Sequence, residues 1–117
     1  MDGPVFDRRD QLDTVAAGLL DGERIIAVYD TPGATGFLGL TDRRVVLQDA
    51  GERTALTSVP YSRLGSVSLV DDRPAAGRRP VASHVAITAG GRTWEVGLRG
   101  DDEARHAHDV ILWHLTR

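Results

Sequence analysis

Three histidines near the end of the chain are the first residues whose type suggests chemistry, since imidazole nitrogens bind metals and transfer protons. They are His106, His108 and His114. Two metal ligands on one helix face are usually four residues apart, whereas His106 and His108 point about 200° apart on a 3.6-residue helix. We therefore interpret the three as ordinary surface and boundary residues, and we expect neither a metal nor a cofactor.

The longest connection, and the one densest in arginine, is the segment DDRPAAGRRP, at 71–80. Its three arginines, Arg73, Arg78 and Arg79, could hold a phosphate or an acidic peptide through paired guanidinium hydrogen bonds. The competing interpretation is a solvated connection whose charges are balanced by its own aspartates. We expect the solvated connection and keep anion binding by the loop 73–79 as the alternative.

Sequence patterns typical of enzymes are missing. There is no GxSxG motif and no phosphate-binding glycine pattern, and the absence of cysteine excludes thiolate chemistry. The acidic pairs at 71–72 and 101–102 adjoin strand and helix ends, where acids commonly serve turns and caps. We expect no catalytic residue and no enzyme. An enzyme would require His84 and the helix histidines to meet in one pocket.

The composition is that of a globular protein. The 117 residues are 41% hydrophobic and 26% charged, so we expect one domain over 1–117 with a packed core. All 14 basic residues are arginine, yet the net charge of −3 argues against nucleic acid as a partner. No apolar run could span a bilayer and no export signal is visible, so the cytoplasm is the expected location.

Apolar residues with helical spacing predict a helix near each end of the chain. The N-terminal helix, over 8–20, would have Asp7 as its N-cap and would end at Gly22. The C-terminal helix, over 102–116, would have Asp101 as its N-cap. Its predicted core face consists of residues that recur at helical spacing: Ala104, Ala107, His108, Ile111, Leu112 and Leu115.

Two apolar residues of the C-terminal helix, Val110 and Trp113, lie off this core-facing stripe. A tryptophan that the core does not use is a common anchor of protein interfaces. We therefore predict an exposed contact patch at Val110 and Trp113, unless the N-terminal helix covers it.

Between 24 and 99 the chain consists of short runs rich in β-branched and aromatic residues. Their spacing of about 8–12 residues is typical of an antiparallel barrel or sandwich. Seven runs are predicted as strands, over 24–30, 35–41, 44–49, 53–59, 64–71, 82–89 and 92–99. Two-residue turns at Gly90-Gly91 and Asp42-Arg43 set the register of two hairpins. The predicted cross-strand pairs are Ile87 with Trp94, Val85 with Val96, Leu40 with Val45 and Leu38 with Leu47.

Three segments resemble the YokE-like group of bacterial pleckstrin-homology domains: LLDGERI at 19–25, GLTDRRVV at 39–46 and VPYSRL at 59–64. The resemblance covers about 19–115. It implies a mainly β, α+β fold, namely a pleckstrin-homology-like barrel of about seven antiparallel strands capped by the C-terminal helix. The N-terminal helix is then an addition. The resemblance brings no catalytic residue and no settled activity, and some relatives assemble into oligomers.

Pleckstrin-homology domains that bind phosphoinositides typically use basic residues around the first hairpin. The corresponding segment here, DTPGAT at 30–35, contains no basic residue. The resemblance therefore carries no lipid site over to this chain, and we expect no phosphoinositide-dependent membrane binding.

These observations predict a non-enzymatic binding or scaffolding module, whose partner is another protein or a second copy of the chain. The contact surface would be a sheet edge that accepts a further strand, the helix flank, or the arginine-rich loop. The alternative function is binding of a small anion or phosphate headgroup through Arg73, Arg78 and Arg79. Strong salt dependence, and loss of binding when these arginines are removed, would favour the alternative.

Overall fold

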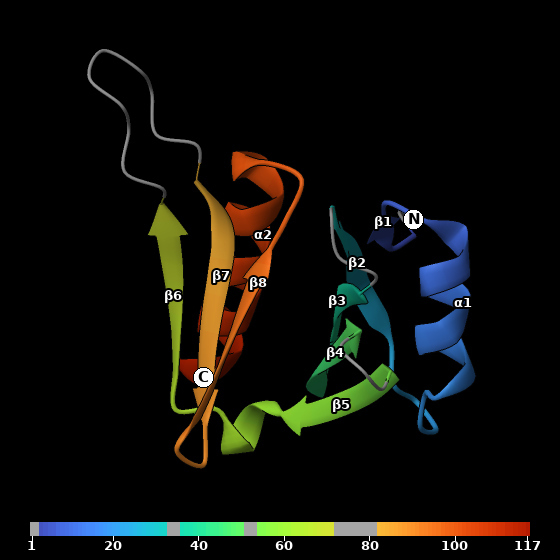
Figure 1. The fold of residues 1–117 in the computed structure, drawn as a ribbon. Helices are drawn as coiled ribbons and strands as arrows, with labels where there is room; N and C mark the ends of the chain where they lie inside the picture. The colour runs from blue at the N-terminus through green and yellow to red at the C-terminus, as the bar shows by residue number, and fades with distance from the viewer. Residues whose placement is uncertain (1–2, 33–35, 51–53, 72–81) are drawn as a thin grey trace.

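Two sheets and two helices make up the described part of the chain (Figure 1). The computed structural model describes residues 3–32, 36–50, 54–71 and 82–117. The sheets stand side by side with a core between them, and the two helices lie on opposite sides of the molecule.

The first sheet has the strand order β1-β2-β3-β4-β5. β1 is a two-residue strand parallel to β2, and each later strand is antiparallel to the one before it. The strands are β1 (Val5–Phe6), β2 (Ile25–Thr31), β3 (Gly36–Thr41), β4 (Arg44–Ala50) and β5 (Thr54–Pro60).

The second sheet has the order β6-β7-β8 and is antiparallel throughout. A 3-10 turn at Tyr61–Arg63 carries the chain into it from β5. Its strands are β6 (Ser66–Asp71), β7 (Ala82–Ala89) and β8 (Arg92–Gly97).

The main core lies between the sheets and is closed at one side by α2 (Asp101–Leu115). This helix packs against β6 and β7 and also reaches β3. Small residues make the close approach possible, because Ala104 and Ala107 are fully buried beside Ile111. The strands contribute alternate residues, as a pleated strand requires. They include Tyr29, Leu38, Leu40, Val45, Val85 and Ile87.

A second, smaller core forms on the outer side of the first sheet, under α1 (Arg9–Ala17). Leu12 and Val15 of the helix pack there on the remaining alternate residues of β2, β3 and β4, namely Val28, Phe37 and Val46. Because both faces of β2 and β3 are covered, nearly every residue of these strands is buried.

The predicted hairpin registers are confirmed. Ile87 pairs with Trp94 and Val85 with Val96, and the other hairpin has the pairs Leu40 with Val45 and Leu38 with Leu47. Gly90 and Gly91 both have positive φ, at 58° and 80°, which is the backbone that a two-residue hairpin turn requires.

The predicted closure of the strands into a barrel is not confirmed. Among the described residues, no strand of the first sheet pairs with a strand of the second. There are also eight strands in this part of the chain instead of seven, because the two residues of β1 are too short to show a strand pattern.

The predicted helix caps need correction. Asp7 does not cap α1, because its carboxylate accepts the backbone N–H of Asp30 at 3.0 Å, and the N-cap residue is Arg8. Asp101 is the first residue of α2, and Gly100 is its N-cap. Leu112 was expected in the core face of α2, yet 42% of it is exposed.

The close approach of β3 to β4 generates a prediction for Gly36. A Cβ at this position would lie 2.1 Å from the backbone oxygen of Gln48. We expect Gly36→Ala to lower the free energy of unfolding by about 1–3 kcal/mol, since one strand must shift. Gly18→Ala is the matched control, because its nearest atom would be 3.8 Å away. Urea denaturation measures both, and equal midpoints would contradict this packing.

Candidate functional site

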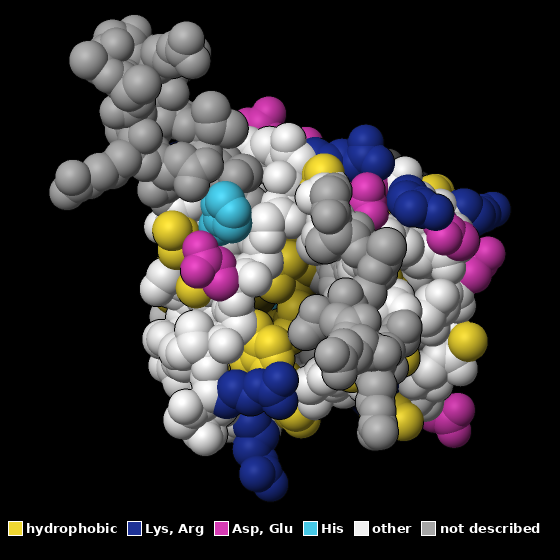
Figure 2. All heavy atoms as spheres, in the orientation of Figure 1, with side chains coloured by type: hydrophobic (Ala, Val, Ile, Leu, Met, Phe, Trp, Pro, Cys, Tyr) yellow, Lys and Arg dark blue, Asp and Glu magenta, His cyan; other side chains and the backbone are white. Residues whose placement is uncertain are grey.

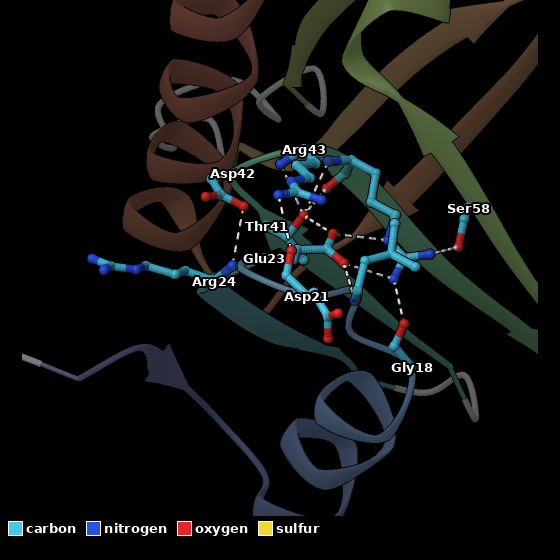
Figure 3. Close-up of polar contacts among 10 residues, drawn as sticks. Gly18, Asp21, Glu23, Arg24, Thr41, Asp42, Arg43 and Ser58 are labelled. Atoms are coloured by element: carbon cyan, nitrogen blue, oxygen red, sulfur yellow. Dashed lines mark hydrogen bonds and ion pairs between the residues drawn. The ribbon is translucent and has the colours of Figure 1, made fainter.

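A buried polar corner joins the end of the α1 segment to the β3–β4 hairpin (Figure 3). Its centre is Glu23, whose side chain is fully buried. The carboxylate accepts hydrogen bonds from Nε and Nη2 of Arg44, each at 2.9 Å, and from Oγ1 of Thr41 at 2.6 Å. It also accepts the backbone N–H of Leu20 at 3.0 Å. Gly22, with φ of 80°, makes the turn that brings Glu23 inward.

Two arginines of this corner, Arg43 and Arg44, are occupied by the protein itself. Arg44 also donates to the carbonyl of Gly18 at 2.6 Å and to Oγ of Ser58 at 3.1 Å. Arg43 donates to the carbonyl of Asp21 at 3.1 Å. Through Glu23, Arg43 and Arg44, the segments LLDGERI and GLTDRRVV therefore hold the fold together at this corner.

The electrostatics of the corner favour an ionised Glu23. Burial alone would raise the pKa of its carboxyl, but the hydrogen bonds from Leu20, Thr41 and Arg44 outweigh burial, and the pKa is lowered. The folded structure thus favours the ionised form of Glu23, which forms an ion pair with Arg44.

A second polar cluster, centred on Asp30 of β2, connects α1 to Arg99 in the short segment between β8 and α2. Asp30 accepts hydrogen bonds from Nε2 of Gln11 at 2.8 Å and from Nη2 of Arg99 at 3.0 Å. Burial would raise the pKa of Asp30, yet these donors and the charge of Arg99 lower it. Asp30 belongs to the segment in which basic residues would mark a lipid site, and its partners show a structural role instead.

The helix histidines do not converge. His106 contacts the hydroxyl of Tyr29 through Nδ1, and His114 stacks on the ring of Tyr61 with centroids 4.0 Å apart. His108 lies 3.0 Å from its neighbour Asp109. Within the described residues no group of three or more His, Asp or Glu side chains could hold a metal ion. His106 and His114 instead attach α2 to Tyr29 of β2 and Tyr61 of the 3-10 turn.

Two of the predicted site residues, Val110 and Trp113, lie together on the outer side of α2. Trp113 is 55% exposed and Val110 is half-buried. They line a pocket of about 490 Å³. The other lining residues are Ile26, Asp42, Asp109, His114 and Arg117. We call this surface the α2 flank. It is not covered by α1, which packs on β2 and β3 at the other side of the molecule.

The guanidinium of Arg117 lies over the ring of Trp113, 4.4 Å from its centroid. This contact holds the exposed tryptophan against the rim of the pocket. Sequence reasoning missed Ile26 and Arg117 as members of the surface. Ile26 comes from β2 and is adjacent to α2 only in the folded chain, whereas the spacing of Arg117 from Trp113, four residues, was a signal that could have been used.

The other predicted site residues, Arg73, Arg78 and Arg79, lie outside the described residues. Anion binding by the loop 73–79 therefore stays a prediction. No helix within the described residues is long and apolar enough to cross a membrane.

Sequence reasoning also missed a groove between the two sheets. All six residues of β8 line one side of a cavity of about 320 Å³, and residues of β2, β3 and β4 line the other. We call it the seam groove. The sequence predicted the strand at 92–99, but only the folded sheet shows that β8 is its edge strand among the described residues.

The comparisons with known proteins give structural matches only. No protein-family model matches the chain, and no curated protein does. A pleckstrin homology domain from Shewanella amazonensis superposes with a TM-score of 0.67 at 15% identity, over 95% of this chain and 100% of that one. A DUF1696 family protein with a pleckstrin-homology domain, from Shewanella loihica, superposes with a TM-score of 0.60 at 16% identity, over 93% and 98% of the two chains.

The chain has a pleckstrin-homology-like fold. This agrees with the resemblance seen in the sequence, and the structural relatives are bacterial proteins. At identities of 15% and 16% the likeness concerns the fold alone. Membership of the YokE-like group stays a prediction.

The polar corner generates a prediction for stability and its pH dependence. Because the folded-state pKa of Glu23 is lowered, its contribution to stability is present above about pH 4.5, the ordinary glutamate pKa, and is lost as pH falls through the folded-state value. We expect Glu23→Gln to lower the free energy of unfolding at pH 7 by about 1–3 kcal/mol. The variant should also lose less stability than wild type when the pH is lowered from 5 to about 3.

Urea denaturation at pH 7, 5 and 3 measures both effects. Asp10→Asn is the control, because the pair of Asp10 with Arg8 is exposed and should contribute less than about 1 kcal/mol. If Glu23→Gln matches wild type at pH 7, the corner does not stabilise the fold as described.

Proposed function

We propose that this chain is a non-enzymatic interaction module that associates with a second copy of itself through the α2 flank. The observation that carries the proposal is Trp113, a large aromatic side chain that is 55% exposed beside an apolar pocket. Buried tryptophans are among the residues that contribute most to protein interfaces. An exposed tryptophan next to a pocket provides both halves of a self-complementary contact.

The charges of the α2 flank support a two-fold arrangement. Two copies of α2 can pack antiparallel around a two-fold axis that passes beside residue 113 of each copy. A residue that precedes 113 in one copy then lies opposite the residue that follows 113 by the same number of positions in the other copy. Asp109 and Arg117 are each four residues from Trp113, and all three line the same pocket. Arg117 lies just beyond the end of α2, but its guanidinium is over the Trp113 ring, so Asp109 of each copy would approach Arg117 of the other, and two opposite-charge pairs would flank the two tryptophans.

The surroundings of the tryptophan are suited to a rigid contact. His114 lies edge-on to the Trp113 ring, with centroids 4.9 Å apart, and stacks on Tyr61. The hydroxyl of Tyr61 in turn donates to the carbonyl of Thr41 at 2.7 Å. Because the α2 flank is held through these contacts to the buried polar corner, little conformational entropy would be lost when it binds.

The absence of an enzymatic role is part of the proposal and is supported by two observations. The three histidines of α2 have separate partners and do not form a shared site. The pleckstrin-homology-like fold is also one that suggests binding or scaffolding. Fold alone does not decide function, so the weight of the proposal rests on the α2 flank.

The first test is the solution mass of wild type and Trp113→Asp, measured by light scattering over a range of concentrations. Wild type should form a dimer, and the variant should dissociate with a Kd at least about 30-fold higher, because a buried tryptophan anchor contributes about 2 kcal/mol or more. A wild-type monomer at every concentration, or a dimer that persists in Trp113→Asp, would contradict the proposal.

The charge arrangement has its own test, a charge swap. Asp109→Arg and Arg117→Asp should each weaken the dimer, since like charges then face each other, and the double variant should restore it. Asp13→Arg is the control, because it makes the same charge change on the exposed face of α1. Additive losses in the double variant would rule out the two-fold arrangement while leaving open another contact through Trp113.

A further inference from the structure

The seam groove runs along the free edge of β8. Its upper part, the cavity of about 320 Å³, is lined by all of Arg92–Gly97 and, on the other side, by Thr31, Gly36, Leu47 and Gln48. A second cavity of about 560 Å³ continues it toward β5 and shares Arg92 and Trp94 with the first. Figure 2 shows hydrophobic side chains at the bottom of a hollow between the two sheets, with basic side chains below it.

Within the described part of the chain, no strand pairs with the outer edge of β8. The backbone N–H of Gly65 bonds to the carbonyl of Thr88, so the polar groups of Thr88 point toward β6. Because these groups alternate along a strand, Ile87 and Ala89 bond to their partners Trp94 and Arg92. The N–H and C=O groups of the remaining residues of β8 then point outward, into the groove. These residues are Thr93, Glu95 and Gly97.

The side chains along this edge alternate in the way that a bound strand would need. Trp94 and Val96 are half-buried and pack against the main core, whereas Thr93 and Glu95 are exposed. A strand added to β8 would place every second side chain on the apolar side, beside Trp94 and Val96. Across the groove this apolar side is closed by Leu47 of β4.

The lower end of the groove is positively charged. Arg63 and Arg92 both line the second cavity, and none of the described residues that line it is acidic. The guanidinium of Arg92 lies 4.7 Å from the centroid of the Trp94 ring, which holds it at the groove. A carboxylate on the ligand would therefore be favoured at this end.

We propose that the seam groove binds an extended peptide segment of another protein, about six residues long, as an additional strand antiparallel to β8. Its apolar side chains lie against Trp94 and Val96, and an acidic side chain lies at Arg63 and Arg92. The bound strand lies between the two sheets, where the structure leaves them unpaired. This site is distinct from the α2 flank and does not depend on self-association.

The probe for the test is the hexapeptide acetyl-TVTVTD-amide. In the proposed register its two valines lie opposite Val96 and Trp94, and its aspartate lies opposite Arg92. Trp113→Phe leaves Trp94 as the only tryptophan, so that Trp94 fluorescence reports binding at the groove. Saturable binding with a Kd below about 1 mM is expected. No change of emission at several-fold higher peptide concentration would overturn the proposal.

Two N-methylated forms of the peptide are matched controls for strand pairing. In the proposed register the second and third threonines donate their N–H groups to β8, and the valines do not. Methylating these two threonine nitrogens should weaken binding at least about tenfold, whereas methylating the two valine nitrogens should leave it within about threefold. Equal binding of the two methylated peptides would overturn strand addition.

The charged end is tested by a double-mutant cycle. Replacing the aspartate of the peptide by asparagine should weaken binding about tenfold to wild type, and much less to Arg92→Gln.

Inorganic phosphate alone should not reproduce the Trp94 response. If phosphate reproduces the Trp94 response and also displaces both methylated peptides, the groove is an anion site and the proposal is wrong. Trp94 emission that varies with protein concentration without peptide would show that a second copy occupies the groove, which also contradicts it.

Discussion

The buried ion pair of Glu23 with Arg44 is the interaction on which the rest of the structure depends. It places a charged carboxylate where water cannot reach it, so each of its oxygens must have a donor in the fold. Meeting that requirement fixes the turn after α1, the β3–β4 hairpin and Thr41 relative to one another. Through Tyr61, which bonds to Thr41 and stacks on His114, the same constraint reaches α2 and the exposed Trp113. A structural corner thus determines the position of a candidate binding surface.

The parts of the fold that the sequence predicts are those decided locally. The pairing of Ile87 with Trp94 follows from the Gly90-Gly91 turn and from the alternation of apolar residues. Both residues lie within a few positions of that turn. Every antiparallel pair of the described residues joins consecutive strands, and the chain forms two sheets because strands far apart in the sequence do not pair, which no local pattern decides. The role of Glu23 was hidden for the same reason, since Thr41 and Arg44 are about twenty residues away in the chain. Within the candidate site, Trp113 could be predicted because it lies off the core-facing residues of its helix. Ile26 could not be predicted, because it lies in β2 and is close to Trp113 only in the folded chain.

Two surfaces follow from this architecture, and they differ in what they offer. The α2 flank offers an aromatic side chain, a pocket and charges spaced symmetrically about Trp113, which suits an identical partner. The seam groove offers unpaired backbone groups and a positively charged end, which suits an extended segment with an acidic side chain at that end. The charged residues Arg92 and Glu95 on β8 would also discourage indiscriminate pairing of this edge with other strands.

The distance between two identical sites on α2 tests the central claim, the two-fold contact at Trp113, most directly. The chain has no native cysteine, so Arg105→Cys can carry a single nitroxide label on an exposed position of α2. With antiparallel helices about 9 Å apart and a rise of about 1.5 Å per residue, the two labelled Cα atoms would be about 25 Å apart. Pulsed electron paramagnetic resonance should therefore give a narrow distribution centred near 25 Å. A sample with no dipolar coupling, or with a distribution centred far from that value, would contradict self-association through this surface.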